Sequence, residues 1–153
     1  RGILSPDRRS ISTETTLRVE RGLGGGEGSK NVPAAGQTIR VRSLGGKVGE
    51  VRMHVAGAPR LGVGERLVLF LTQRQGHRWV LGMNQGVFDL RVGADGKDQV
   101  RQRLKGASLV QKTEGGLKPV TARPVVEALG RFLDRVRQTQ KTCDKEPGSC
   151  RVR

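Results

Sequence analysis

Aromatic residues are scarce in this chain, which has 153 residues but only three Phe, one Trp and no Tyr. Small β-barrels that bind single-stranded nucleic acid stack the bases on exposed rings. Phe70 and Phe88 fall in apolar strand patterns and are expected to be buried. The scarcity of rings therefore gives little support to specific single-strand recognition.

Long apolar runs are also missing from the chain. Hydrophobic residues make up 34% of it, the mean hydropathy is -0.48, and the longest uninterrupted aliphatic or aromatic run is Leu67 to Leu71. A membrane-spanning helix needs about 20 consecutive apolar residues. We therefore expect no transmembrane segment, and the 23 glycines predict a small, turn-rich core.

The motifs of common enzyme classes are absent. No serine lies in the Gly-x-Ser-x-Gly pattern of hydrolases, and the glycine-rich stretch 22–28 lacks the Gly-Lys-Ser/Thr ending of a phosphate-binding loop. The only two histidines, His54 and His77, lie far in sequence from both cysteines and outside any zinc-binding spacing. We predict a chain that is not an enzyme and that uses neither a cofactor nor a metal.

The two cysteines, Cys143 and Cys150, flank a short stretch that contains the turn-forming pair Pro147-Gly148. This spacing allows a disulfide, and we predict one. Disulfides persist in oxidising compartments, so the bond in turn predicts a periplasmic or secreted protein. Arg1 at the start is typical of a processed or trimmed chain, and the lack of a signal peptide carries no information about export.

Positive charge dominates the composition, with 29 Lys and Arg against 14 Asp and Glu, a formal net charge of +15, and 21 arginines. Arginine makes bidentate contacts with phosphate, sulfate and carboxylate groups, so the chain is expected to attract polyanions. A GC-rich genome would enrich Arg, Gly, Val and Ala without any such ligand, and the composition leaves both explanations open. No polybasic tract stands out along the chain.

Alternating apolar and polar residues predict a series of β-strands. Residues 11–20 and 38–44 have period two, and in the second stretch Arg40 and Arg42 face away from the core. The outward arginines of the predicted strands form the candidate polyanion-binding set, namely Arg40, Arg42, Arg78 and Arg91. Further strands are predicted around residues 50–55, 67–71, 78–83, 87–92 and 99–103.

The remaining patterns give these strands an order. The apolar run 67–71 predicts a central strand covered on both faces, and the polar stretch 99–103 predicts an edge strand. Residues 75–77 and 94–97 predict hairpin turns. A helix over about 122–139 is predicted by an apolar stripe at helical spacing, Val125, Leu129, Phe132, Leu133 and Val136.

Strands followed by a single helix predict a mainly β fold, a small antiparallel barrel or OB-like sheet closed by one C-terminal α-helix. We expect residues 1–140 to form a single β-rich domain that includes this helix. Residues 141–153 are expected to form a tail with the Cys143–Cys150 loop. The oligomeric state is not indicated by any pattern in the chain.

Several stretches between residues 11 and 92 combine apolar strand residues with turn glycines. They are Thr15–Glu20, Ile39–Val41 before Gly45-Gly46-x-Val48-Gly49, Ala58–Leu61, Val63–Leu71, and Val80-Leu81-Gly82-Met83-x-Gln85-Gly86-x-Phe88. In this order they resemble an uncharacterised module of exported bacterial proteins. The resemblance implies export and strengthens the disulfide prediction, and it supplies no catalytic or ligand-binding residues.

Together these patterns predict an exported, non-enzymatic binding or structural module. Its expected partner is anionic, such as a polysaccharide, an envelope polyanion or an acidic protein. One alternative is a nucleic-acid-binding OB-like barrel. Another is a purely structural accessory domain without a ligand, whose positive charge is compositional.

Overall fold

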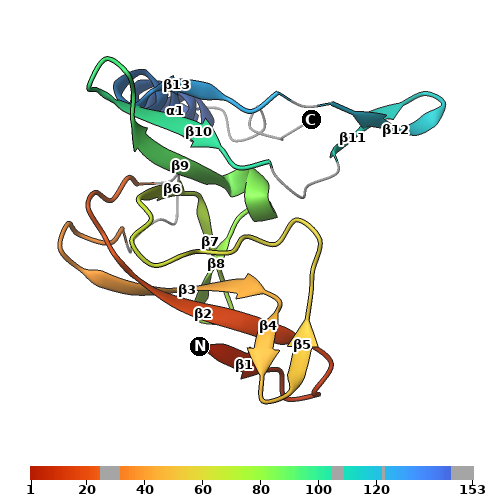
Figure 1. The fold of residues 1–153 in the computed structure, drawn as a ribbon. Helices are drawn as coiled ribbons and strands as arrows, with labels where there is room; N and C mark the ends of the chain where they lie inside the picture. Colours follow the sequence, from red (N-terminus) through yellow and green to blue (C-terminus); the bar gives the residue numbers. More distant parts are fainter. Residues whose placement is uncertain (25–31, 105–108, 122, 146–153) are drawn as a thin grey trace.

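The fold is mainly β with one C-terminal helix (Figure 1). The structure is a computed structural model that describes residues 1–24, 32–104, 109–121 and 123–145. Within these ranges the strands form a five-stranded sheet, a four-stranded sheet and two separate two-stranded hairpins. No helix in these ranges is both long and apolar enough to span a membrane.

The five-stranded sheet has the strand order β1-β2-β3-β8-β7. Its strands are β1 (Gly2–Leu4), β2 (Ile11–Arg18), β3 (Thr38–Leu44), β8 (His77–Val80) and β7 (Leu71–Arg74). The pairs are antiparallel except β3 and β8, which run parallel. The two period-two stretches are confirmed as strands. The β7–β8 hairpin is confirmed too, and its turn residues Gln75 and Gly76 both have positive φ, as a tight hairpin turn requires.

The four-stranded sheet is fully antiparallel, with the order β13-β10-β9-β6. Its strands are β13 (Val126–Ala128), β10 (Asp98–Gln102), β9 (Val87–Val92) and β6 (Leu67–Leu69). The expectation of an edge strand at 99–103 is wrong, because β13 pairs with the outer side of β10. Val100 in β10 is accordingly fully buried.

One chain segment joins the two sheets. The run 67–71 was expected to form a single central strand, but Phe70 divides it into β6 and β7, each at the edge of a different sheet. The backbone N–H of Phe70 donates to the carbonyl of Gly86, and its carbonyl accepts from the N–H of Leu81. The segment passes from one sheet to the other, but the two sheets are not closed into a barrel, so the predicted barrel or OB-like closure is not confirmed.

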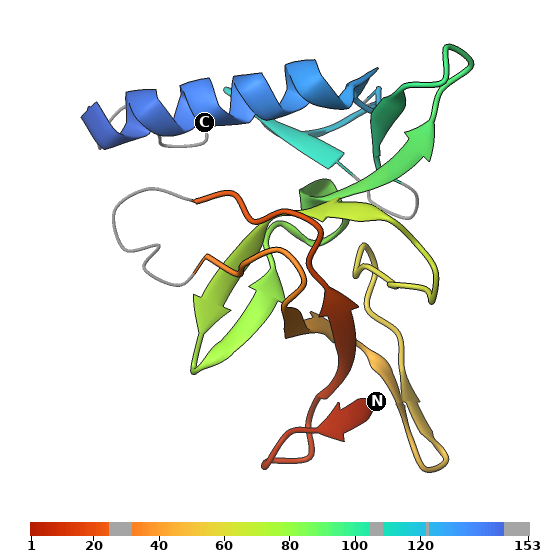
Figure 2. The same ribbon diagram turned by 90° about the vertical axis from the view of Figure 1, so that its left-hand side faces the viewer.

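The helix α1 (Leu129–Lys145) begins later than the predicted start near residue 122. Residues 126–128 pair with β10 instead, and the N–H of Gln102 donates to the carbonyl of Val125. Sheet pairing thus overrides the helical spacing ahead of Leu129. Figure 2 shows the helix lying along the side of the molecule formed by the four-stranded sheet.

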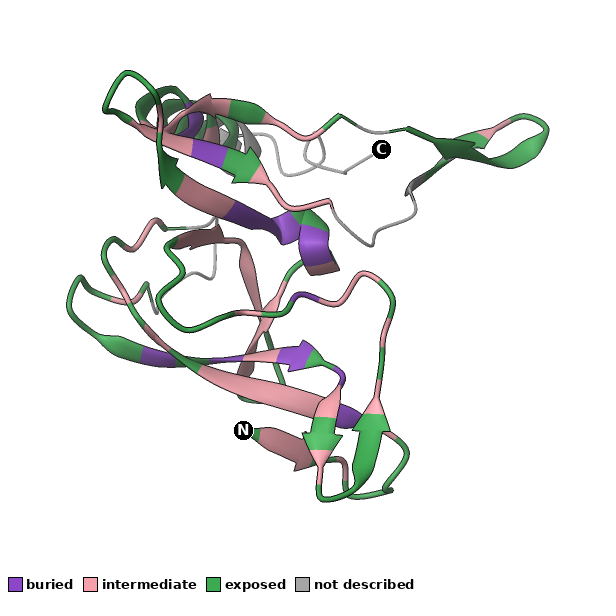
Figure 3. Cartoon of the chain, in the orientation of Figure 1, coloured by how far each residue is buried: buried purple, intermediate pink, exposed green. Residues whose placement is uncertain are grey.

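The main core lies between α1 and the four-stranded sheet. It contains Phe88, Val100, Phe132 and Leu133, with Phe70 and Leu129 packed against it. Phe88 and Phe132 have ring centroids 4.7 Å apart, and Phe70 lies 5.8 and 6.3 Å from them. Figure 3 shows further buried segments on β3 and near the short helix η1 (Met83–Gly86). All three phenylalanines therefore belong to one cluster where the sheets meet.

The two separate hairpins extend from the body of the molecule (Figure 1). They are β4 (Gly46–Val48) with β5 (Val51–Met53), and β11 (Leu109–Thr113) with β12 (Gly116–Val120). Every residue of β12 is exposed, including Leu117. The predicted strand near 50–55 is thus confirmed as the short strand β5.

Candidate functional site

The strands β2 and β3 place Arg40 and Arg42 on one sheet face. Ile39 and Val41, which alternate with them, are 7% and 1% exposed, so the arginines lie on the opposite, outward face. Glu14 of β2 pairs with Arg42, and Thr16 pairs with Arg40. The predicted outward orientation of both arginines is consistent with this register.

The parallel pairing of β3 with β8 adds an aromatic residue to this face. Arg42 pairs with Trp79, and paired residues in a sheet project from the same face. Alternation then places His77 with Trp79, and the β7 partners of these two residues are Arg74 and Thr72. Four paired residues, one on each of β2, β3, β8 and β7, therefore lie side by side on this face: Glu14, Arg42, Trp79 and Thr72.

We call the outward positions of β2, β3, β8 and β7 the basic face. Its central members are Glu14, Thr16, Arg18, Thr38, Arg40, Arg42, Thr72, Arg74, His77 and Trp79. Four of these ten positions are arginines and one is an acid. The face therefore carries a clear local excess of positive charge.

A hollow of about 460 Å³ lies on this face. Its lining includes Glu14, Arg40, Arg42 and His77 from the basic face, together with Arg1. Arg78 lines the hollow as well, but it pairs with Val41, so its side chain belongs to the other face of the sheet. Of the four arginines predicted from the sequence, Arg40 and Arg42 thus lie together on one face, and Arg78 only adjoins them.

Glu14 holds one of these two arginines in place. Its Oε2 accepts a hydrogen bond from Nε of Arg42 at 3.3 Å, and its Oε1 lies 4.0 Å from Nη1 of Arg40. The side chains of Glu14 and Arg42 are 17% and 20% exposed, whereas that of Arg40 is 76% exposed. Arg42 is therefore positioned by its partner, and Arg40 extends into solvent.

Arg91 lies on the other sheet, away from the basic face. It is an exposed residue of β9 and lines a second hollow of about 850 Å³, together with His54, Arg60, Glu65 and Arg103. The arrangement therefore separates Arg91 from the other three predicted contacts.

The second hollow contains its own acidic partners. Arg103 forms ion pairs with Asp89 and with Glu65, the latter at 3.3 Å, and donates to the carbonyl of Arg60. Burial lowers the pKa of Arg103, but the hydrogen bonds and charges of Asp89 and Glu65 outweigh it and raise the pKa overall. Arg103 is therefore engaged by its neighbours and adds little free charge to this hollow.

Comparison with known protein families, with curated proteins and with solved structures gives no match to this chain.

Arg66 forms a bridge of ion pairs between two segments of the chain. Arg66 forms ion pairs with Glu20 at 2.9 Å and with Asp98 at 3.3 Å, bridging the segment after β2 and the start of β10. The hydrogen bond from Arg66 lowers the pKa of Glu20. Since these side chains are largely exposed, the bridge contributes little to the free energy of unfolding.

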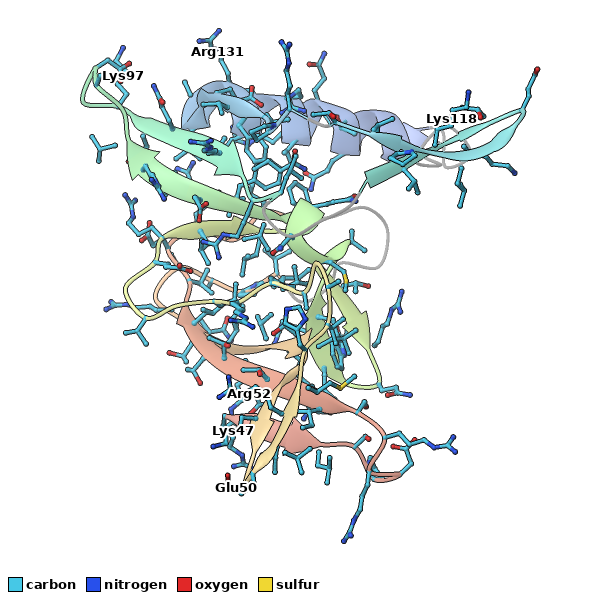
Figure 4. All side chains as sticks on the ribbon, turned by 45° about the vertical axis from the view of Figure 1, so that its right-hand side comes forward. Lys47, Glu50, Arg52, Lys97, Lys118 and Arg131 are labelled. Carbon is cyan, nitrogen blue, oxygen red and sulfur yellow. The ribbon has the colours of Figure 1, made fainter. Side chains whose placement is uncertain are left out.

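Outside the basic face, four arginines line the second hollow, namely Arg60, Arg66, Arg91 and Arg103, and other cations lie at distant ends of the molecule. Figure 4 shows Lys47 and Arg52 on the β4–β5 hairpin, Lys97 at the β9–β10 turn, Lys118 on β12 and Arg131 on α1, all projecting outward. Lys47 also lies 4.0 Å from Glu50 on the same hairpin. These cations do not form a second basic face in this view.

The structure describes only one of the two cysteines. Cys143 falls in the last turns of α1, and Cys150 lies outside the residues that the structure describes, so the disulfide stays a prediction. Over the described ranges, no three His, Cys, Asp or Glu side chains gather as metal ligands.

The sequence patterns missed Glu14, Arg74, His77 and Trp79 as members of the face. Alternation in 77–80 already places His77 with Trp79, but the sequence gives no signal for the parallel pairing of β8 with β3. That pairing is what brings the tryptophan beside Arg42.

Proposed function

We propose that this chain is an exported, non-enzymatic binding module whose basic face engages a polyanion. The observation that carries the proposal is the register of β2, β3, β8 and β7, which assigns Arg18, Arg40, Arg42 and Arg74 to one face against the single acid Glu14. The proposal needs no closed barrel, because all four strands belong to one sheet.

The spacing of the basic face suits a polymer with repeated negative charges. Residues two apart on a strand are separated by about 6.7 Å, and neighbouring strands by about 4.8 Å. Guanidinium groups at these intervals can each meet a phosphate or sulfate in bidentate geometry. Because Arg40 is mostly exposed, its contacts remain hydrated and are expected to weaken with added salt.

Retention on heparin across a salt gradient tests the proposal. We expect elution well above the physiological ionic strength of about 0.15 M, and later than from a sulfonate cation exchanger that lacks a polymeric ligand. Elution from heparin below that ionic strength would contradict the proposal. It would support a structural accessory domain whose charge is compositional.

Replacing the acid of the basic face is expected to strengthen binding. Glu14→Gln removes a negative charge next to Arg40 and Arg42 while keeping the size of the side chain. We expect the affinity for heparin to rise about fivefold, equal to about 1 kcal/mol for one charge about 4 Å away in water. Isothermal titration at 0.15 M salt measures the change.

The matched control for Glu14→Gln is Glu127→Gln, which removes an acid that pairs with Arg135 far from the basic face. It should leave the affinity within about twofold, because charges beyond about 8 Å are screened at this ionic strength. Equal gains from both variants would mean that only net charge matters.

A further inference from the structure

The distribution of aromatic residues separates Trp79 from the other rings of the chain. The three phenylalanines contact one another in the core beneath α1. Trp79, the single tryptophan of the chain, is instead a half-buried residue of β8 on the basic face. Its indole is thus the one large ring that the fold assigns to this face.

The neighbours of Trp79 on the basic face are polar, and one of them is an arginine. Arg42 lies beside it on β3 and Thr72 on β7, while His77 precedes it by two residues on β8. Adjacent strands are about 4.8 Å apart, so Arg42 is within reach of any group that contacts the indole. A ring next to cations on an open sheet face offers stacking and phosphate contacts to the same ligand.

We propose that the polyanion bound by the basic face is a single-stranded nucleic acid, with one base stacked on Trp79 and flanking phosphates on Arg40 and Arg42. This inference rests on the proposed function and adds the class of ligand. A sulfated polysaccharide satisfies the arginines but has no flat aromatic ring for the indole. A duplex satisfies them too, but its bases are stacked inside and their faces are covered.

The charge of the face complements this ligand. Arg18, Arg40, Arg42 and Arg74 lie on three strands of one sheet, β2, β3 and β7, with β8 between the last two. Glu14 already engages Arg42 through Nε. Because this face has one large aromatic ring, it can stack a single base, and it does not read the sequence of the ligand. The expected mode is therefore non-specific and salt-dependent.

The test compares a 12-nucleotide oligothymidine with an oligomer of the same length and phosphate count whose central positions are abasic. Affinities are measured by fluorescence anisotropy at several salt concentrations. We expect the wild-type chain to bind the abasic oligomer about tenfold more weakly. Trp79→Leu should bind both equally, and Trp79→Phe, which keeps a ring, should retain most of the difference.

Two further readouts separate stacking from a loss of folding. Because the chain has one Trp and no Tyr, its emission reports on Trp79 alone, and oligothymidine should quench it while heparin should not. Heparin affinity of Trp79→Leu should stay within about threefold of the wild type. An unchanged circular-dichroism spectrum and thermal transition show separately that the variant is folded.

Equal binding of the two oligomers by the wild type, with no quenching, would overturn this inference. Strong heparin binding in the same experiment would leave the proposed function intact and point to a polysaccharide. Failure of heparin and of both oligomers to bind at 0.15 M salt would instead overturn the proposed function.

Discussion

Arg40→Ala combined with Arg42→Ala is expected to lower the affinity for heparin about 30-fold at 0.15 M salt. Each arginine can make a charge-assisted contact of about 1 kcal/mol net, and two of them correspond to a loss of about 2 kcal/mol. The slope of log affinity against log salt should fall by between one and two, because fewer counterions are released. Isothermal titration over a series of salt concentrations gives both quantities.

The matched control for this double variant is Arg91→Ala with Arg101→Ala. Both residues are exposed arginines on strands of the four-stranded sheet, so the variant loses the same net charge from a different sheet. We expect its affinity to fall by less than about threefold. Equal losses from the two double variants would show that the +15 charge acts as a diffuse field.

Phe132→Ala is expected to lower the free energy of unfolding by about 3–5 kcal/mol. Phe132 is 2% exposed and contacts Phe88 and Phe70, so the substitution leaves a cavity where α1 packs against the four-stranded sheet. Chemical denaturation followed by circular dichroism measures the change. Since the free energy of unfolding of a native domain is about 5–15 kcal/mol in total, the variant is expected to be close to unfolding.

Leu117→Ala serves as the control for this core substitution. Leu117 is 70% exposed on β12, so removing its side chain leaves no cavity. Its effect should stay within about 0.5 kcal/mol. A small effect of Phe132→Ala, comparable to that of Leu117→Ala, would mean that the phenylalanine cluster does not hold α1 against the sheets.

Local patterns predicted several strands of the two larger sheets, but β11, β12 and β13 lie where no strand was predicted. The period-two stretches became β2, β3 and β9, and the turn residues at 75–76 and 94–97 joined hairpins. Each of these features depends on neighbours close in sequence. Alternation also placed Arg40 and Arg42 outward, since the burial of Ile39 and Val41 follows from the same period.

Features that depend on distant pairing could not be predicted in the same way. The segment 126–128 has helical spacing, but its pairing with β10 turns it into β13 and moves the latter strand from the edge to the interior. Likewise, no local pattern in 67–71 indicates that Phe70 divides it between two sheets. The barrel closure predicted from strands followed by one helix is not confirmed. In both cases, contacts between residues far apart in sequence determine which strands pair.

The residues of the candidate site likewise fall into those predictable from one strand and those that depend on distant strand pairing. The pair Arg40 and Arg42 was predictable from one strand, whereas Trp79 joined them only through the parallel pairing of β3 with β8. Arg78 was predicted as a polyanion contact because it projects from the predicted strand 78–83. It pairs with Val41, so its side chain lies on the opposite face of the sheet. Arg91 lies on a different sheet altogether.

Chemical-shift mapping shows whether the positive charge of the surface is organised into one binding face. A short heparin oligosaccharide is titrated into uniformly ¹⁵N-labelled protein at 0.15 M salt. We expect the largest amide shifts in β2, β3, β7 and β8. Shifts of equal size around Lys47, Lys97, Lys118 and Arg131 would contradict this expectation, because they would mean that the polyanion binds wherever the surface is positive.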